Sequence, residues 1–357
     1  MYATVQELVD ALTPEEKIGQ LFIIRPDALD LTLPQETIND AKADGVTMLT
    51  DAMRETLQAY PVGGICQFGK NITDPEQLAQ FNADLQAASR TPLFIAVDEE
   101  GGAVARLANH PAFDLPQYES AAAVGASGDP ADACAMGQTI GAYLKEYGFN
   151  MDFAPDADVN TNPDNPIIGT RAFSSDATTA AEMAAAAADG LRSGLQAGGV
   201  RCCAKHFPGH GDTAEDSHTA LAVTYKTLDE LQACELLPFA ADTGLHAVMV
   251  GHIAAPNVTG DGTPATLSPQ LVALIPDAEN TLIVTDSLAM DAITAAYTPG
   301  EAAVQALQAG CDVLLMPNSL PEAYAAVLEA VQNGTISEER LDRSVNKILL
   351  YKQQFAS

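Results

Sequence analysis

The chain has 357 residues, of which 47% are hydrophobic, so it can bury a large core and is not a disordered chain. Its 48 acidic residues against 17 basic ones give a net charge of −31. A field of that sign repels phosphate backbones and anionic membrane surfaces, so we expect no nucleic-acid partner and no membrane-surface partner. No segment approaches the ~20 apolar residues of a membrane span.

The chain starts without the basic residues and the apolar run of an export signal, so we expect none. Its cysteines show no CxxC spacing, which favours buried, reduced thiols over a zinc site or a disulfide framework. We therefore expect a cytoplasmic protein, with a trimmed exported or lipid-anchored form as the alternative. The cysteines are Cys66, Cys134, Cys202, Cys203, Cys234 and Cys311.

Short apolar runs recur along the chain and predict eight strands. Each has four to seven residues and is rich in Val, Ile, Leu or Phe, as expected for parallel strands that are buried on both faces. The runs are Leu21–Ile24, Val62–Phe68, Leu93–Val97, Phe149–Phe153, Val200–Cys203, Ala247–Val250, Thr281–Val284 and Asp312–Met316.

The segments between these runs have helical character. Thr13-Pro14-Glu15-Glu16 is a capping box with proline at the first helical position, and Thr73-Asp74-Pro75-Glu76 has a similar form. The Ala-rich segments and the apolar spacing near the C-terminus predict further helices. The predicted helices include Gln77–Ala88, Pro130–Glu146, Thr178–Leu195, one capped by Thr227, Pro321–Gln332 and Ser337–Phe355.

Eight strands with intervening helices predict an α/β protein of the (β/α)8 TIM barrel class. We expect one domain over residues 1–357, with no second C-terminal domain, as a monomer or weak homodimer. An open doubly wound sheet is the alternative, but no GxGxxG follows the first strand. The long connection Pro26–Tyr60 predicts extra helices between the first two strands.

Polar residues follow the predicted strands, where the catalytic groups of a barrel lie. Five of the six histidines also fall within positions 206–252, three of them in or near one Gly-rich segment. This pattern predicts a catalytic site. The polar groups are Asp98-Glu99-Glu100 with Arg106, Asp152 with Asp156 and Asp158, Gly169-Thr170-Arg171, Lys205 to Asp212, Asp216-Ser217-His218, His252 and Asp286.

Two kinds of hydrolase fit this cluster poorly. A metal hydrolase would use His206, His210, Asp212 and His218 as ligands, but Lys205 adjoins them and the sequence has no HExxH. A serine hydrolase would use Ser217 or Ser287, but no GxSxG is present.

Glycoside hydrolysis fits the cluster better. It needs one carboxylate near the anomeric carbon and a second group that protonates the leaving oxygen. Asp286 is the candidate carboxylate, and His218 oriented by Asp216 is the candidate acid. The exposed loop position of Glu215 makes it a weaker alternative acid, and we expect Asp156 and Asp158 to serve the loop structure.

Several of these segments resemble glycoside hydrolase family 3, in particular its bacterial β-N-acetylhexosaminidase (β-N-acetylglucosaminidase) branch. The most specific resemblance is Lys205-His206-Phe207-Pro208-Gly209-His210-Gly211-Asp212-Thr213 followed by Asp216-Ser217-His218. The supporting segments are Asp98-Glu99-Glu100-Gly101-Gly102 with Arg106, Gly169 to Asp176, Ala265-Thr266-Leu267-Ser268 and Thr285 to Met290, so the resemblance spans residues 15 to 350.

The resemblance implies a retaining enzyme that hydrolyses terminal β-linked N-acetylglucosamine through a covalent glycosyl-aspartate intermediate. Asp286 would be the nucleophile, and His218 the general acid and then base, oriented by Asp216. An imidazole suits this role at neutral pH because its pKa lies near the operating pH. The resemblance assigns the binding of sugar hydroxyls to Asp98, Arg106, Arg171, Lys205 and His206.

The resemblance leaves the reaction partly open. A β-N-acetylglucosaminide phosphorylase or a broad β-glucosidase of the same family remains an alternative, and a metal-dependent hydrolase on a TIM barrel is a more distant one. We expect a carbohydrate as the only partner, and neither a cofactor nor a metal.

Overall fold

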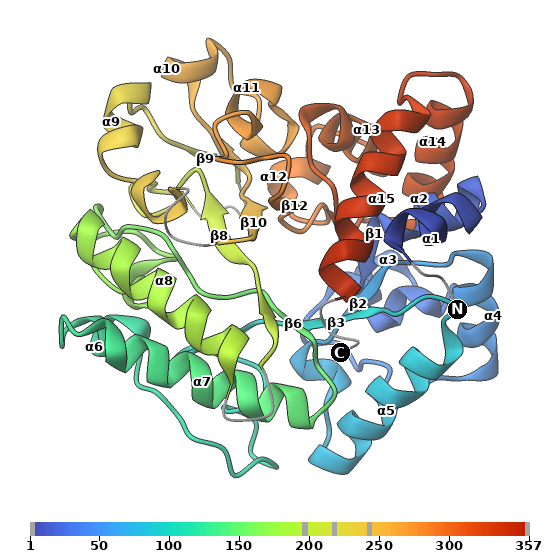
Figure 1. Ribbon diagram of the computed structural model, residues 1–357, viewed down its shortest axis with the longest axis horizontal. Coiled ribbons are helices and arrows are strands. Elements are labelled where there is room, and N and C mark those ends of the chain that lie inside the picture. Colours follow the sequence, from blue (N-terminus) through green and yellow to red (C-terminus); the bar gives the residue numbers. More distant parts are fainter. Residues whose placement is uncertain (1–3, 195–198, 216–219, 241–244, 354–357) are drawn as a thin grey trace.

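The computed structural model describes residues 4–194, 199–215, 220–240 and 245–353. Strands lie in the middle of the molecule and helices surround them (Figure 1). Each of the eight predicted runs overlaps a strand, and the fifth run is followed directly by one more. The strands are β1 Phe22–Ile24, β2 Gly64–Cys66, β3 Phe94–Val97, β6 Met151–Asp152, β7 Arg201–Cys202, β8 Ala204–Phe207, β10 Ala247–Val250, β12 Leu282–Thr285 and β13 Leu314–Leu315.

These strands form a curled, wholly parallel α/β arrangement. One sheet has the order β13-β1-β2-β3-β6-β7, and a second has the order β12-β10-β8. Val284 in β12 forms a parallel bridge with Val313, next to β13, and only Cys203 separates β7 from β8. The strands are buried along nearly their whole length, which is why most of their sequences are continuous apolar runs rather than alternating ones. β8 differs, because it contains Lys205 and His206.

Two small pairs of strands lie outside these sheets. β4 (Glu99–Gly101) and β5 (Val104–Ala105) form an antiparallel hairpin directly after β3. β9 (Ala222–Val223) pairs in parallel with β11 (Ile253–Ala254). The hairpin extends the end of β3, so it places Glu100 and Arg106 close to Asp98.

The helices begin where the sequence predicts caps. Thr13 accepts a hydrogen bond from the backbone N–H of Glu16, and the Glu16 carboxylate accepts one from the N–H of Thr13. The helices are α1 Val5–Ala11, α2 Pro14–Gln20, α3 Gln35–Asn39, α4 Asp51–Ala59, α5 Pro75–Ala88, α6 Ala121–Gly125, α7 Pro130–Glu146, α8 Ala177–Ser193, α9 Leu228–Ala233, α10 Pro256–Thr259, α11 Pro269–Val272, α12 Asp291–Thr294, α13 Pro299–Ala309, α14 Leu320–Gln332 and α15 Glu338–Gln353.

The predicted helices between the first two strands are confirmed by the 3₁₀ helix η1 (Pro26–Leu29), α3 and α4. Helix α13, between β12 and β13, is an addition to the prediction, although Thr298 and Glu301 form the same capping box there. Helices α7 and α8 pack closely because Gly137 and Gly190 lie at their contact. A Cβ at Gly137 would lie 2.2 Å from the carbonyl oxygen of Ala187.

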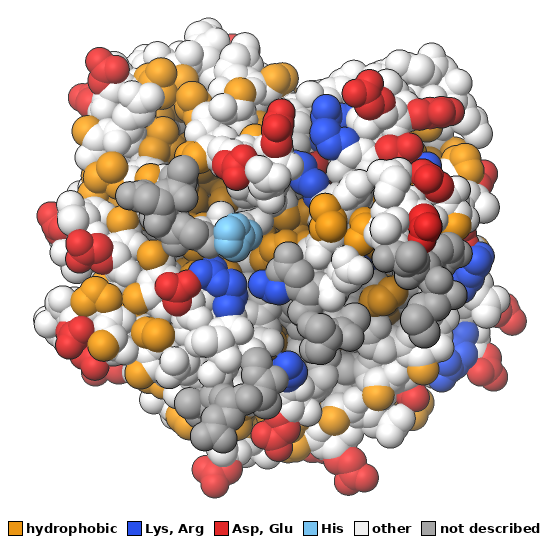
Figure 2. All heavy atoms as spheres, in the orientation of Figure 1, with side chains coloured by type: hydrophobic (Ala, Val, Ile, Leu, Met, Phe, Trp, Pro, Cys, Tyr) orange, Lys and Arg blue, Asp and Glu red, His pale blue; other side chains and the backbone are white. Residues whose placement is uncertain are grey.

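The excess of acidic residues lies largely on the surface. Figure 2 shows acidic side chains spread over one face and its rim, with some of the Lys and Arg side chains gathered near its centre beside a histidine. None of the helices in the described parts of the chain combines the length and the apolar character needed to cross a bilayer.

Candidate active site

The strand ends enclose a cavity of about 490 Å³, within the range of roughly 300–1,000 Å³ that is usual for small-molecule sites. Each of the eight strand positions contributes to its wall, because the carboxyl ends of parallel strands meet at one edge. The wall residues in or just after the strands include Arg25, Phe68, Asp98, Phe153, Lys205, His206, Met249, Asp286, Ser287, Leu315 and Met316.

Six of the predicted site residues lie in this wall together, although up to 188 positions separate them in the chain. They are Asp98, Arg106, Arg171, Lys205, His206 and Asp286. The remaining two, Asp216 and His218, lie outside the described residues. The proposed pairing of Asp216 with His218 therefore stays a prediction from the sequence.

Lys205 is the centre of a network of ion pairs. Its buried ammonium lies 2.7 Å from Oδ1 of Asp98 and 2.7 Å from Oε1 of Glu100. Arg171 reaches the same glutamate with two donors, Nε to Oε2 at 2.9 Å and Nη2 to Oε1 at 2.7 Å. This fork geometry fixes the guanidinium plane as well as its position.

The charged groups in this network shift the pKa values of one another. Burial raises the pKa of Asp98, but the nearby charges of Lys205 and Arg106 outweigh it and hold the pKa below its ordinary value. Burial alone would lower the pKa of Lys205, yet Asp98 and Glu100 raise it above its ordinary value. These shifts favour the ionised forms at neutral pH, so the network offers charged donors and acceptors to a polar ligand in the cavity.

Glu100 was missed as a site residue, although it belongs to the run Asp98-Glu99-Glu100. Strand geometry turns consecutive side chains to opposite sides. Glu99 accepts hydrogen bonds from the N–H groups of Leu107 and Ala108, away from the cavity, whereas Glu100 lines the cavity. A run of acidic residues signals the site but not which carboxylate faces it.

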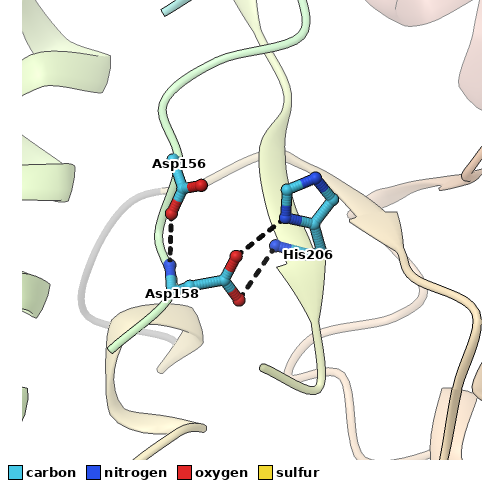
Figure 3. A group of neighbouring side chains, drawn as sticks. All are labelled: Asp156, Asp158 and His206. Atoms are coloured by element: carbon cyan, nitrogen blue, oxygen red, sulfur yellow. Dashed lines mark hydrogen bonds and ion pairs between the residues drawn. The ribbon is translucent and has the colours of Figure 1, made fainter. Parts of the chain in front are cut away.

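His206 is held by Asp158, on the loop that follows β6 (Figure 3). Nδ1 of His206 lies 2.7 Å from Oδ2 of Asp158, and the backbone N–H of His210 donates to Oδ1 of Asp158 at 2.6 Å. Burial lowers the pKa of His206, but the charge of Asp158 outweighs it and raises the pKa. Asp158 does not line the cavity, so its role is to orient His206.

Asp156 has a different environment from Asp158. Its Oδ1 accepts the backbone N–H of Asp158 at 3.0 Å, while its buried Oδ2 has no hydrogen-bond partner among the described residues. The nearest cation is Arg171, whose Nε lies 3.6 Å from that oxygen. Burial and the neighbouring charge of Asp158 raise the pKa of Asp156 to about 7.

Asp156, Asp158 and His206 bring three potential metal ligands within 4.8 Å of one another. This group fits a cation poorly, because Asp158 already accepts from His206 and the positive charge of Arg171 lies 3.6 Å from Asp156. Two other residues of the metal-hydrolase alternative have partners as well, while His218 lies outside the described residues. Nδ1 of His210 lies 2.7 Å from the Thr213 hydroxyl, and Asp212 accepts from Thr224 at 2.6 Å.

The serine-hydrolase alternative is not supported at Ser287. Its hydroxyl oxygen is buried and has no hydrogen-bond partner among the described residues, so no described histidine activates it. His252 instead lies 2.5 Å from the Thr266 hydroxyl and 2.8 Å from the backbone carbonyl of Ser287. His252 does not line the cavity, and these two contacts hold the loop after β12 in place.

Asp286 follows β12 directly and lies in the cavity wall. Its backbone N–H donates to the carbonyl of Val250 in β10 at 2.9 Å, which fixes the residue at the sheet edge. Its Oδ1 accepts from the N–H of Ser287 at 2.7 Å, and the side chain is half-buried. A carboxylate on rigid strand-end backbone, open to the cavity, has the access that a nucleophile needs.

Sequence reasoning also missed the side of the cavity formed by β1 and β2. Arg25, Phe68 and Lys70 lie there beside Asn39 of α3. These residues belong to no catalytic motif. They line the cavity because β1 and β2 are neighbours in the sheet and end at the same edge as the other strands.

Two curated relatives share most of this chain. Beta-hexosaminidase A of Pseudoalteromonas piscicida is 32% identical in an alignment of 339 residues that covers 86% of this chain but 56% of that protein. Beta-hexosaminidase of Stenotrophomonas maltophilia is 33% identical over 304 residues, which are 83% of this chain and 87% of that protein.

A solved structure shows the same fold. The glycoside hydrolase family 3 beta-N-acetylglucosaminidase from Paenibacillus sp. str. FPU-7 superposes with a TM-score of 0.84 at 38% identity. The match covers 97% of this chain and 63% of that one. Residues 13–350 also match the family model described as the glycosyl hydrolase family 3 N terminal domain. The chain therefore belongs to glycoside hydrolase family 3.

Proposed function

We propose that this chain is a retaining β-N-acetylhexosaminidase that hydrolyses terminal, non-reducing β-linked N-acetylglucosamine. The observation that carries the proposal is the position of Asp286 in the wall of a cavity that also holds Asp98, Lys205, Arg171 and His206. The name of the Paenibacillus beta-N-acetylglucosaminidase, at 38% identity, supports this sugar, and the names of the two beta-hexosaminidases, at 32–33% identity, support the same class of substrate.

In the proposed reaction, the sugar is held by the charged network around Lys205. The Asp286 carboxylate attacks the anomeric carbon while His218 protonates the leaving oxygen. His218, oriented by Asp216, then takes a proton from water, which cleaves the glycosyl–aspartate ester. Two displacements at one carbon retain its configuration, so the first product is the β-anomer.

The nucleophile is tested with Asp286→Gly. The variant should lose turnover of 4-nitrophenyl β-N-acetylglucosaminide, and added azide should restore release of nitrophenol with formation of the α-glycosyl azide. An external anion fits only where a carboxylate has been removed from the reacting face. Activity of the variant near the wild-type level without azide would overturn the assignment.

The acid/base is tested with His218→Ala and with Glu215→Gln as the matched control on the same loop. Glu215 is exposed, so its loss should leave activity unchanged. His218→Ala should slow substrates with poor leaving groups far more than activated aryl glycosides, because only the former need protonation. Equal losses on both substrate types would contradict an acid role.

We also propose that the strands close into a single (β/α)8 barrel. The bridge between Val284 and Val313 supports closure on one side, and the adjacency of β7 and β8 supports it on the other. The N–H of Val313 donates to the carbonyl of Ile283 at 3.0 Å. This amide should exchange with solvent as slowly as the amides of β10, whereas fast exchange would indicate an open edge.

We propose a cytoplasmic location on chemical grounds. All six cysteines are free thiols, and four of them are buried. Thiols persist in a reducing compartment. Fractionation of the native host tests the proposal. Detection of this chain in the cytosolic fraction would support it, and detection outside the cytosol would contradict it.

A further inference from the structure

A chain of hydrogen bonds behind the cavity ends at Asp286. Nε2 of His252 lies 2.8 Å from the backbone carbonyl oxygen of Ser287, and the N–H of Ser287 donates to Oδ1 of Asp286 at 2.7 Å. On the other side of the ring, Nδ1 of His252 lies 2.5 Å from the hydroxyl oxygen of Thr266. We call these contacts the Thr266–His252–Ser287 chain. It connects a buried imidazole to the candidate nucleophile.

The three residues of this chain come from three separate segments. His252 follows the end of β10, Thr266 lies in the 3₁₀ helix η6 (Ala265–Leu267), and Ser287 lies in the loop after β12. β10 and β12 are paired neighbours and lie side by side in Figure 1. The imidazole therefore connects the end of one strand and η6 to the loop that begins with Asp286.

The partners of the His252 ring fix both of its nitrogens. A carbonyl oxygen only accepts, so Nε2 carries a proton and donates it to the carbonyl of Ser287. The Thr266 hydroxyl contacts Nδ1 and also lies 3.1 Å from the carbonyl oxygen of Gly251. His252 and Thr266 are both fully buried, so water cannot replace either contact. The ring cannot turn without losing these hydrogen bonds.

Ser287 transmits this constraint to Asp286 through its backbone. The Ser287 hydroxyl has no hydrogen-bond partner among the described residues, so the hydroxyl does not hold the segment. The peptide unit after Ser287 is held at both ends, because its carbonyl accepts from His252 and its N–H, on Leu288, donates to the carbonyl of Leu315 at 2.9 Å. The N–H of Ser287 therefore keeps its direction toward Oδ1 of Asp286.

This direction matters for a nucleophilic carboxylate. Attack requires one carboxylate oxygen to point at the anomeric carbon, and the Asp286 side chain is only half-buried. Its hydrogen bond to the N–H of Ser287 restrains the side-chain torsions. A misplacement of a reacting group by about 1 Å can cost on the order of 100-fold in rate.

We propose that His252 is a positioning residue for the nucleophile, which acts through the Ser287 backbone to orient the Asp286 carboxylate for attack. His252 does not line the cavity, so it contacts neither the sugar nor the leaving group. The inference rests on the proposed function, because it takes Asp286 to be the nucleophile. Loss of the imidazole should slow the attack and leave sugar binding unchanged, since the charged network around Lys205 lies on other strands.

The experiment separates the attack from proton transfer and from binding. The 5-fluoro derivative of N-acetylglucosaminyl fluoride should trap the glycosyl–aspartate ester, and its fluoride leaves without a proton from His218. The maximal rate constant of this inactivation therefore reports the attack by Asp286. Competitive inhibition by N-acetylglucosamine reports the binding of the sugar.

His252→Leu keeps the approximate size of the ring and removes both of its hydrogen bonds. We expect the inactivation rate constant to fall about 30-fold or more, while the inhibition constant for N-acetylglucosamine stays within about threefold. His252→Gln should recover most of the rate, because its amide nitrogen can still donate to the Ser287 carbonyl. His246→Leu is the matched control, since it removes an exposed histidine just before the same strand and should change neither value.

Thr266→Val tests the chain from its other end. It keeps the shape of the side chain and removes the hydroxyl that contacts Nδ1 of His252. The inactivation rate constant should fall about fivefold, and the substitution should add nothing in His252→Leu, because both residues act through one chain. If His252→Leu does not fold, Thr266→Val decides the test, and an unchanged rate constant in it would overturn the proposal.

The outcomes are distinguishable. An inactivation rate constant in His252→Leu close to that of the wild type would refute the positioning role. A parallel loss of sugar binding, or no recovery in His252→Gln, would refute it too, because the imidazole would then only support the fold of the site. Failure of the proposed function differs, since the wild type would not hydrolyse N-acetylglucosaminides, or mass spectrometry would find the trapped sugar on a residue other than Asp286.

Discussion

The Nζ atom of Lys205 lies 2.7 Å from Oδ1 of Asp98, although 107 positions separate the two residues in the chain. The contact joins the second residue of β8 to the residue that directly follows β3. It supplies a fixed donor and a fixed acceptor on the same wall.

Lys205→Met should reduce kcat/KM for an aryl N-acetylglucosaminide by 100-fold or more and lower the free energy of unfolding by about 2–4 kcal/mol. The cause of the destabilisation is that Asp98 and Glu100 lose their shared cation while they stay buried. Kinetics and urea unfolding measure the two effects. Lys17→Met is the control, since the Lys17–Asp342 pair at the surface is worth about 1 kcal/mol or less. A fall in kcat/KM far smaller than 100-fold in Lys205→Met would refute the role of Lys205 in substrate binding.

Asp158→Asn should lower the pKa of the His206 imidazole, because the charge that outweighs burial is removed. NMR titration of the ring measures this pKa directly, and kcat/KM should fall about tenfold or more as the ring loses its orientation. Asp176→Asn changes a carboxylate that caps α8 on the surface and should leave the His206 titration unchanged. An unaltered pKa in Asp158→Asn would contradict the assigned contact.

Asp156→Asn should stabilise the fold above pH 7. The pKa of Asp156 is about 7 in the fold and 3.8 ordinarily, so the folded state binds more protons between these values. Stability of the wild type therefore falls as pH rises from about 4 to 7, and the cost remains at higher pH. We expect Asp156→Asn to gain on the order of 2 kcal/mol at pH 8 and little at pH 4.5. Thermal unfolding at both values tests this, and an equal gain at both would refute the raised pKa.

Lys352→Met should show the opposite pH dependence. Lys352 in α15 is buried, with Nζ 2.8 Å from the Gln20 side-chain oxygen and 4.9 Å from the centre of the Phe94 ring. Burial lowers its pKa to about 7 from 10.5. The unfolded state binds more protons between these values, so this lysine destabilises the fold most at and below pH 7, and stability rises with pH up to about 10.5.

The measurement is the free energy of unfolding of Lys352→Met against wild type at pH 6.5 and 9.5. The change should be more favourable to the variant at pH 6.5 by roughly 2 kcal/mol. Lys347→Met provides the contrast, because Lys347 pairs with the buried Asp312 at 2.8 Å and its loss should destabilise at both pH values. A pH-independent effect at Lys352 would show that its ammonium keeps its ordinary pKa.

The sequence determined the strands, most helices and the family to which the chain belongs. Most strands can be recognised from their own residues, because a strand buried on both faces is largely apolar, as in Phe22–Ile24. Caps are equally local, since Thr13 and Glu16 satisfy each other within one turn. Helix α13 begins with the same capping box at Thr298 and Glu301, so its start is encoded locally as well.

Only the tertiary structure decided which side chains meet. It turned Glu100 rather than Glu99 to the cavity, placed Asp158 on His206, and set Arg25 and Arg106 against the Phe68 ring. These contacts depend on strand order and on which way a side chain points, and neither is encoded within one segment. The same reason applies to the buried charge of Lys352. Burial is a property of the assembled helices and strands, so no local sequence pattern shows that the Lys352 ammonium is removed from solvent.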